Sequence, residues 1–194
     1  RAVAVKRVAV HLTDDPAFRD RLVRAATAAW HLEPHPGIAK FHKIVSHGRR
    51  LDLIGEFVDG EALTGVLASR RMLPAVVCAT YAREVLAALA WAHERGVTHG
   101  GLTPANVMRT REGMVKVVDF GSSLGAEAPS SSDIGSFGAL LRVMAGDDFA
   151  AAGLSSELAA ACMKQHPAER PTAAVLLAAM SPPCDPPGDT PGNP

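Results

Sequence analysis

Long hydrophobic runs, paired cysteines and an excess of either charge are all missing from this sequence of 194 residues. No run approaches the roughly 18 uncharged apolar residues that a membrane-spanning helix needs, and residues 1–6 lack the apolar segment of a signal peptide. Cys78, Cys162 and Cys184 are far apart and form no CxxC pair. This pattern argues against a disulfide framework or a structural zinc site and favours a reducing cytoplasm.

Charge is balanced, because Lys plus Arg and Asp plus Glu both number 20. No strong field therefore favours nucleic acid or an anionic membrane surface as a partner. Apolar residues make up 47% of the chain, enough to bury one core or two small lobes packed together. The sequence begins at Arg1 within an expected strand and without an initiator Met, so we expect it to be cut from a longer protein.

The first 58 residues are predicted to be mostly strand with one helix. Asp15 is a helix cap and Pro16 suits the first helical position, so a helix is expected from there to about Trp30. One face of this helix is apolar: Phe18, Leu22, Ala26 and Ala29. The strand-like runs are 3–10, 41–46 and 51–58.

Residues 59–180 are predicted to be mainly helical. One helical stripe ends at Gly96, a strand pair at 106–109 and 114–118 follows, and a second stripe spans 134–144. The remaining residues, 181–194, are rich in proline and lack the apolar side chains that would offset the entropy of ordering them. They are interpreted as a disordered linker.

Short motifs occur along the chain in the order and spacing of the protein kinase fold. The sequence at 99–106 reads HGGLTPAN where a kinase catalytic loop would read HRDLKPAN. The other motifs resemble the VAIK strand, the hinge, the DFG segment, the start of the long C-lobe helix and the late arginine motif: Val3–Lys6, Glu56–Val58, Asp119–Gly121, Asp133–Gly138 and Pro167–Thr172. On these motifs the chain is identified as a degenerate, pseudokinase-like member of the bacterial (actinobacterial-type) serine/threonine protein kinase family.

The resemblance implies an α+β, bilobal fold. A small β-rich N-lobe would occupy 1–58, without the first strands and the glycine-rich loop, which would lie before Arg1. A helical C-lobe with a shortened activation segment would occupy 59–180. Arg170 in the last motif lacks the glutamate with which it would pair, so a buried Arg170 needs another acceptor.

The resemblance also implies a nucleotide site that is partly retained, with ATP and Mg²⁺ as the cofactor. Lys6 would hold the inner phosphates, while Asn106 and Asp119 would each offer an oxygen to the metal. Further positions implied against the cofactor are Ala4, Gly55, Glu56, Val58 and Met108. Taken singly, the three polar residues have structural alternatives as a strand-end Lys, a turn-capping Asn and a solvated loop Asp.

Gly55 precedes the hinge, at the position of the kinase gatekeeper. One interpretation is a strand glycine at a bulge or a close backbone approach. The other is a nucleotide pocket that is open at its back wall.

The machinery that acts on the phosphate acceptor is missing, so no catalytic residue is predicted. Gly101 stands where the family has its catalytic Asp, and Thr103 stands where a Lys would steady the transferred group. Loss of a general base typically costs about a hundredfold to ten-thousandfold in rate. The glutamate expected near Ala25 or Ala26 is also missing, and Asp20 and Glu33 are poor substitutes for it.

Three functions remain open from the sequence. The first is a pseudokinase domain that holds Mg-ATP and acts through a protein partner. The second is an active but atypical serine/threonine kinase, because most catalysis of phosphoryl transfer is positioning and electrostatics. The third is a small-molecule phosphotransferase, since His99–Gly101 resembles the HGD loop of the enzymes that act on aminoglycosides.

The expected partner is a phosphopeptide-binding or membrane-associated signalling protein, and no nucleic acid. The expected location is the cytoplasm, including the cytoplasmic part of a membrane-anchored protein, with tethering through flanking sequence.

Overall fold

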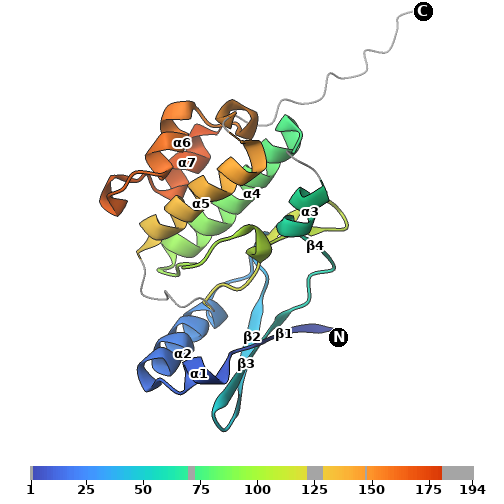
Figure 1. Ribbon diagram of the computed structural model, residues 1–194, viewed down its shortest axis with the longest axis vertical. Helices are drawn as coiled ribbons and strands as arrows, with labels where there is room; N and C mark the ends of the chain where they lie inside the picture. The colour runs from blue at the N-terminus through green and yellow to red at the C-terminus, as the bar shows by residue number, and fades with distance from the viewer. Residues whose placement is uncertain (1, 70–72, 122–128, 147, 181–194) are drawn as a thin grey trace, which may run out of the picture.

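The computed structural model describes residues 2–69, 73–121, 129–146 and 148–180. Figure 1 shows two lobes, with strands β1–β3 and helices α1 and α2 at one end and the longer helices at the other. The predicted α+β fold is thus confirmed.

A three-stranded antiparallel sheet forms the N-terminal lobe, with β3 between β1 and β2. Its strands are β1 (Val3–Arg7), β2 (Phe41–His47) and β3 (Arg50–Glu56). Phe41 pairs with Gly55 and Lys43 pairs with Ile54, so His42 is an extra residue at a bulge beside Gly55. The strand predicted at 51–58 ends at Glu56, and the residues after it connect the two lobes.

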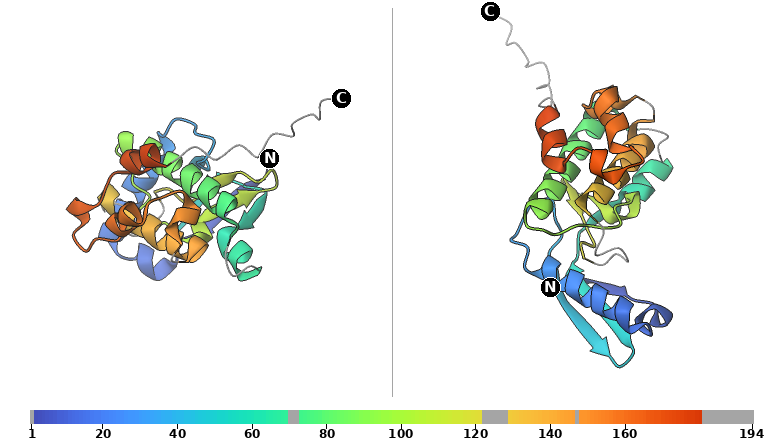
Figure 2. Two further views of the ribbon diagram at one scale, coloured as in Figure 1. Left: turned by 90° about the horizontal axis from the view of Figure 1, so that it is seen from above. Right: turned by 90° about the vertical axis from the view of Figure 1, so that its left-hand side faces the viewer.

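Helix α2 (Pro16–Trp30) begins as its sequence predicts: Asp15 accepts a hydrogen bond from the Ala17 amide at 2.9 Å, and Pro16 takes the first position. The strand predicted at 3–10 is wrong at its end, because α1 (Val10–Thr13) is helical. There the Thr13 hydroxyl donates to the Val10 carbonyl at 3.0 Å and turns the chain. Figure 2 shows α2 lying across the sheet. The core between them contains Val8, Phe18, Leu22, Ala26, Leu51 and Leu53.

The C-terminal lobe is built around α4 (Ala75–Glu94), whose Val85, Leu86 and Leu89 are fully buried. Around it lie α3 (Leu63–Ser69), α5 (Ser130–Ala145), α6 (Ser156–Cys162) and α7 (Ala173–Ala179), with short 3-10 turns η1 (Pro104–Asn106), η2 (Phe149–Ala152) and η3 (Pro167–Glu169). Among the described helices, α4 alone is long and apolar enough to cross a membrane, and half of its apolar window is buried inside the molecule. Its role as the core helix accounts for that composition.

A second small sheet joins the lobes. It consists of β4 (Gly60–Ala62), β5 (Val107–Thr110) and β6 (Val115–Val117). The chain between α2 and β2 pairs with it, since the Ala39 amide donates to the Val117 carbonyl at 2.9 Å and the Val117 amide donates to Gly37 at 2.8 Å. These bonds fix one wall of the space between the lobes.

Two sequence expectations concern buried polar groups in the C-terminal lobe. Cys78 and Cys162 are free and buried, and burial raises the pKa of each thiol to about 11. Cys184 lies outside the described residues. Arg170 finds its acceptors on the backbone: its Nε donates to the Lys164 carbonyl and its Nη1 to the Ser131 carbonyl, both at 2.9 Å.

Candidate functional site, a pocket between the lobes

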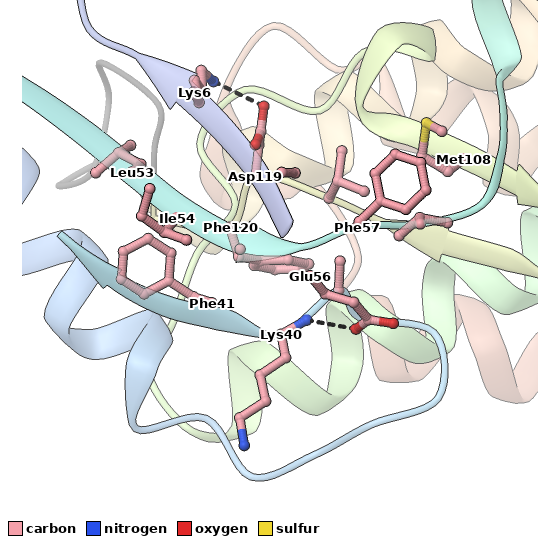
Figure 3. Close-up of a pocket in the computed structure, with 15 residues that line it drawn as sticks. Lys6, Lys40, Phe41, Leu53, Ile54, Glu56, Phe57, Met108, Asp119 and Phe120 are labelled. Atoms are coloured by element: carbon pink, nitrogen blue, oxygen red, sulfur yellow. Dashed lines mark hydrogen bonds and ion pairs between the residues drawn. The ribbon is translucent and has the colours of Figure 1, made fainter. Parts of the chain in front are cut away.

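A cavity of about 250 Å³ lies between the N-terminal sheet and the segment that carries Asp119 (Figure 3). Every residue predicted to contact the cofactor lines this pocket, except Asn106. Those that line it are Ala4, Lys6, Gly55, Glu56, Val58, Met108 and Asp119. The structure therefore gathers residues from three distant parts of the chain around one cavity.

Gly55 has both of the features considered for it. The bulge at His42 lies beside it, and a Cβ at Gly55 would meet only the Lys40 carbonyl, at 3.4 Å, within 4 Å. That distance is ordinary van der Waals contact. The pocket wall at Gly55 consequently carries no side chain and has room for one.

Lys6 and Asp119 form an ion pair at the polar end of the pocket, with 2.9 Å between Nζ and Oδ2 (Figure 3). Asp119 has φ of +69°, a left-handed conformation that Asp adopts more readily than most residues. The two sequence substitutes for the missing helix glutamate lie elsewhere: Asp20 is exposed, and Glu33 pairs with Arg95 at 3.4 Å. Lys6 instead takes the carboxylate of Asp119 as a partner.

Glu56 anchors the opposite end of the pocket. Its Oε2 accepts from the Lys40 amide at 3.0 Å, and its Oε1 pairs with Lys116 Nζ at 2.5 Å (Figure 3 draws the first of these). Lys116 is on β6 and Lys40 precedes β2, so this carboxylate ties the two lobes together behind the pocket.

The loop at 99–106 is held from behind by Asp133 of α5, which is fully buried. Its carboxylate accepts hydrogen bonds from the His99 amide at 2.8 Å and from the Gly100 amide at 2.7 Å. His93 of α4 lies 2.8 Å from the same carboxylate. Two oxygens thus satisfy three groups in the interior, as buried charge requires.

His99 is fully buried and orients the loop relative to the Asp119 segment. The Gly101 amide donates to Nδ1 at 3.2 Å, so Nε2 carries the proton and donates to the Val118 carbonyl at 3.0 Å. Burial lowers the pKa of His99, which favours this neutral form. The ring also packs edge-on against Phe120, with 4.9 Å between the centroids.

The front of the same loop offers no charged group. Gly101 has no side chain, Thr103 is exposed, and the only nearby polar contact is structural: Asn106 Nδ2 donates to the Gly101 carbonyl at 2.8 Å. Gly100 has φ of +74°, whereas Gly101 is not among the residues with positive φ. A larger residue is therefore compatible with the backbone at position 101.

Helix α2 sits directly on Gly121, which has φ of +71°. A Cβ at Gly121 would lie 2.4 Å from the Ala25 carbonyl oxygen and 2.9 Å from Ala29 Cβ. The alanines that replace the expected glutamate thus belong to a tight helix-to-backbone contact. Most of the segment predicted to be a shortened activation segment, 122–128, lies outside the described residues.

Much of the pocket wall was not predicted. Phe120 is part of the DFG-like motif, and Leu53, Ile54 and Phe57 flank the hinge, so proximity in sequence could have indicated them. No local signal indicates Ala39, Lys40, Phe41 and Val118, which reach the pocket through strand pairing and the link between the lobes.

A two-lobed α+β fold, with a lysine and aspartate pair in the interlobe pocket and a loop held by a buried aspartate, defines a protein of the kinase class. Comparison with known families agrees, since the protein kinase domain matches residues 1–146. This chain belongs to the protein kinase family, whose members in general use ATP with Mg²⁺.

Its relatives include serine/threonine kinases from bacteria and plants. A probable serine/threonine-protein kinase of Streptomyces coelicolor is 37% identical over 125 residues, which cover 62% of this chain and 18% of the relative. Serine/threonine-protein kinase PknA of Mycobacterium tuberculosis is 32% identical over 140 residues, covering 70% and 32%. A CBL-interacting serine/threonine-protein kinase of Arabidopsis thaliana is 31% identical over 121 residues, covering 62% and 28%. The matched region is less than a third of each of these relatives.

Proposed function

We propose that this chain is a pseudokinase domain that binds ATP, is impaired in phosphoryl transfer and acts through a protein partner. One observation carries the proposal. The loop at 99–106 keeps its buried support from Asp133, while Gly101 and Thr103 supply neither a base nor a cation at its front.

The chemistry of phosphoryl transfer gives this difference its meaning. The reaction needs groups that hold the nucleotide and a carboxylate that orients and deprotonates the acceptor hydroxyl. Lys6 and Asp119 lie in the pocket where the first set is needed. No acidic residue occurs between His99 and Asn106, so the second requirement is unmet in that loop.

The decisive experiment restores the missing groups. The double variant Gly101→Asp with Thr103→Lys should gain transfer of labelled phosphate to itself or to a generic substrate, because the loop backbone is already in place. The unchanged chain should remain far below the roughly 1–100 s⁻¹ of ordinary protein kinases.

The control adds Asp119→Ala to the double variant and should remove the gained activity. Transfer by the unchanged chain at ordinary kinase rates would contradict the proposal.

An active, atypical serine/threonine kinase is the alternative, and the presence of both Lys6 and Asp119 in the pocket favours it. Under that alternative the unchanged chain transfers phosphate slowly, and Asp119→Ala abolishes the transfer. Activity that survives Asp119→Ala would come from a contaminant.

The partner part of the proposal follows from the loss of the acceptor machinery, because a domain that transfers little phosphate still presents a folded surface. We propose a phosphopeptide-binding or membrane-associated signalling protein as the partner and the cytoplasm as the location. Binding of a purified candidate should be unaffected by Gly101→Asp, since it does not depend on transfer. A partner whose binding requires restored transfer would contradict this part.

A further inference from the structure

We propose that the pocket binds ATP without a divalent metal, because Lys6 already supplies the positive charge at Asp119. The inference rests on the proposed function to the extent that ATP is taken as the ligand. It concerns the form of the nucleotide and the role of Lys6.

The donor set available to a metal is small. Mg²⁺ in proteins is usually held by one or two carboxylates together with phosphate oxygens. Two carboxylates line this pocket, and Glu56 is committed to Lys116 and to the Lys40 amide. Asp119 is left as the carboxylate at the polar end, and the described residues contain no cluster of three or more Asp, Glu, His or Cys side chains.

Asn106 adds little to this donor set. Its side chain does not line the pocket, and its amide nitrogen is bound to the Gly101 carbonyl at 2.8 Å. Asp119 is thus the group on which a metal ion would depend.

Lys6 would compete with a metal for Asp119. The ion pair is 2.9 Å long, and α2 provides no second carboxylate to which Lys6 could move, because Ala25 and Ala26 stand where one was expected. A dication bound to Asp119 would also lie close to the Lys6 ammonium group and repel it. Two cations would share one carboxylate, so coordination of the metal costs the ion pair and yields little net gain.

The local charge is also suited to a metal-free triphosphate. Lys6 and Asp119 cancel, and Gly101 contributes no negative charge to repel the phosphates. Lys6 is 45% exposed and Asp119 is 32% exposed, so the flexible lysine stem can bring its ammonium group to the phosphates while it stays beside the carboxylate.

The test is the ratio of two dissociation constants for ATP, measured by calorimetry in EDTA and in MgCl2. For the unchanged chain we expect the two constants to agree within about threefold, which is less than 0.7 kcal/mol. In Lys6→Met, Asp119 is free to coordinate a metal, so binding should become weaker in EDTA and the ratio should rise above about tenfold.

Lys43→Met is the matched control, because Lys43 is an exposed lysine on β2 outside the pocket. Its ratio should equal that of the unchanged chain. Thermal unfolding of each variant without ligand checks that it folds.

The outcomes separate this inference from the proposed function. A ratio above tenfold for the unchanged chain overturns the inference and leaves ATP binding intact. A ratio near one in both the unchanged chain and Lys6→Met also overturns it, because Lys6 is then not the cause. Absence of binding in both buffers instead contradicts the proposed ATP-binding function.

Discussion

The back and the front of the loop at 99–106 differ in almost every physical respect. Behind it, Asp133 and His99 are fully buried and each is held by hydrogen bonds to several groups. At the front, Thr103 is exposed, and the nearby Lys6 and Asp119 are 45% and 32% exposed. Stability depends on the buried side, because unsatisfied polar groups are costly only where water is excluded. A chain can therefore lose the reactive front of the loop and still fold.

Asp133→Ala should break this comparison most strongly. It leaves the buried amides of His99 and Gly100 without their acceptor, so we expect a loss of about 4 kcal/mol in the free energy of unfolding. Urea denaturation followed by circular dichroism measures the change.

The control for Asp133→Ala is Thr103→Ala at the exposed front, which should change stability by less than about 0.5 kcal/mol. Similar losses in the two variants would show that the loop is not supported from behind.

Gly121→Ala should have the next largest effect, because it tests the contact between α2 and the Asp119 segment. The added Cβ would overlap the Ala25 carbonyl oxygen at 2.4 Å and would also occupy a left-handed conformation, with an expected cost of about 2–3 kcal/mol. Thermal or urea unfolding measures it.

Gly48→Ala is the matched control for Gly121→Ala. Gly48 has φ of +62° but nothing within 4 Å of an added Cβ, so only the backbone term of about 1 kcal/mol should remain. An equal cost in the two variants would mean that α2 does not press on Gly121.

Acid should weaken the buried side gradually, and this is the smallest effect. Burial lowers the pKa of His99 and of His35, so the unfolded chain binds more protons than the folded one at mildly acidic pH. Stability should be fully present above the unfolded pKa of about 6.5 and should fall as the pH drops below it, by at most about 1.4 kcal/mol per pH unit for each proton.

Unfolding in urea at pH 7.5, 6.5 and 5.5 measures this slope. His99→Gln should flatten it, whereas a variant of the exposed turn residue, His47→Gln, should leave it unchanged. A slope that persists in full in His99→Gln would assign the acid sensitivity to other groups.

Local signals predicted the helices and strands well where the stabilising contacts are local. Asp15 and Pro16 start α2, and Phe18 to Ala29 lie on its buried face, because capping and helical periodicity act within a few residues. The prediction for Val10 was wrong, since valine favours strands but the chain turns there through Thr13. The predicted boundaries at 58, 59 and 180 stay predictions.

The candidate site was predicted only in part, for a related reason. Motif order indicated Lys6, Gly55 and Asp119, and the structure places all three at one pocket. It did not indicate Lys116 as the partner of Glu56, because the two are 60 positions apart and meet only when β6 reaches the back of the pocket. Asn106 was predicted as a ligand, and its amide nitrogen holds the loop at Gly101.

The sequence by itself determined which chemistry is missing, because Gly101 and Thr103 carry no carboxylate or ammonium group in any conformation. It also determined the elements that local capping and periodicity specify. Only the tertiary structure decided how the remaining charges are used. Lys6 meets Asp119 across 113 positions, and the His99 amide meets Asp133 across 34. Such contacts depend on how the lobes pack, which is set by the burial of distant apolar surfaces.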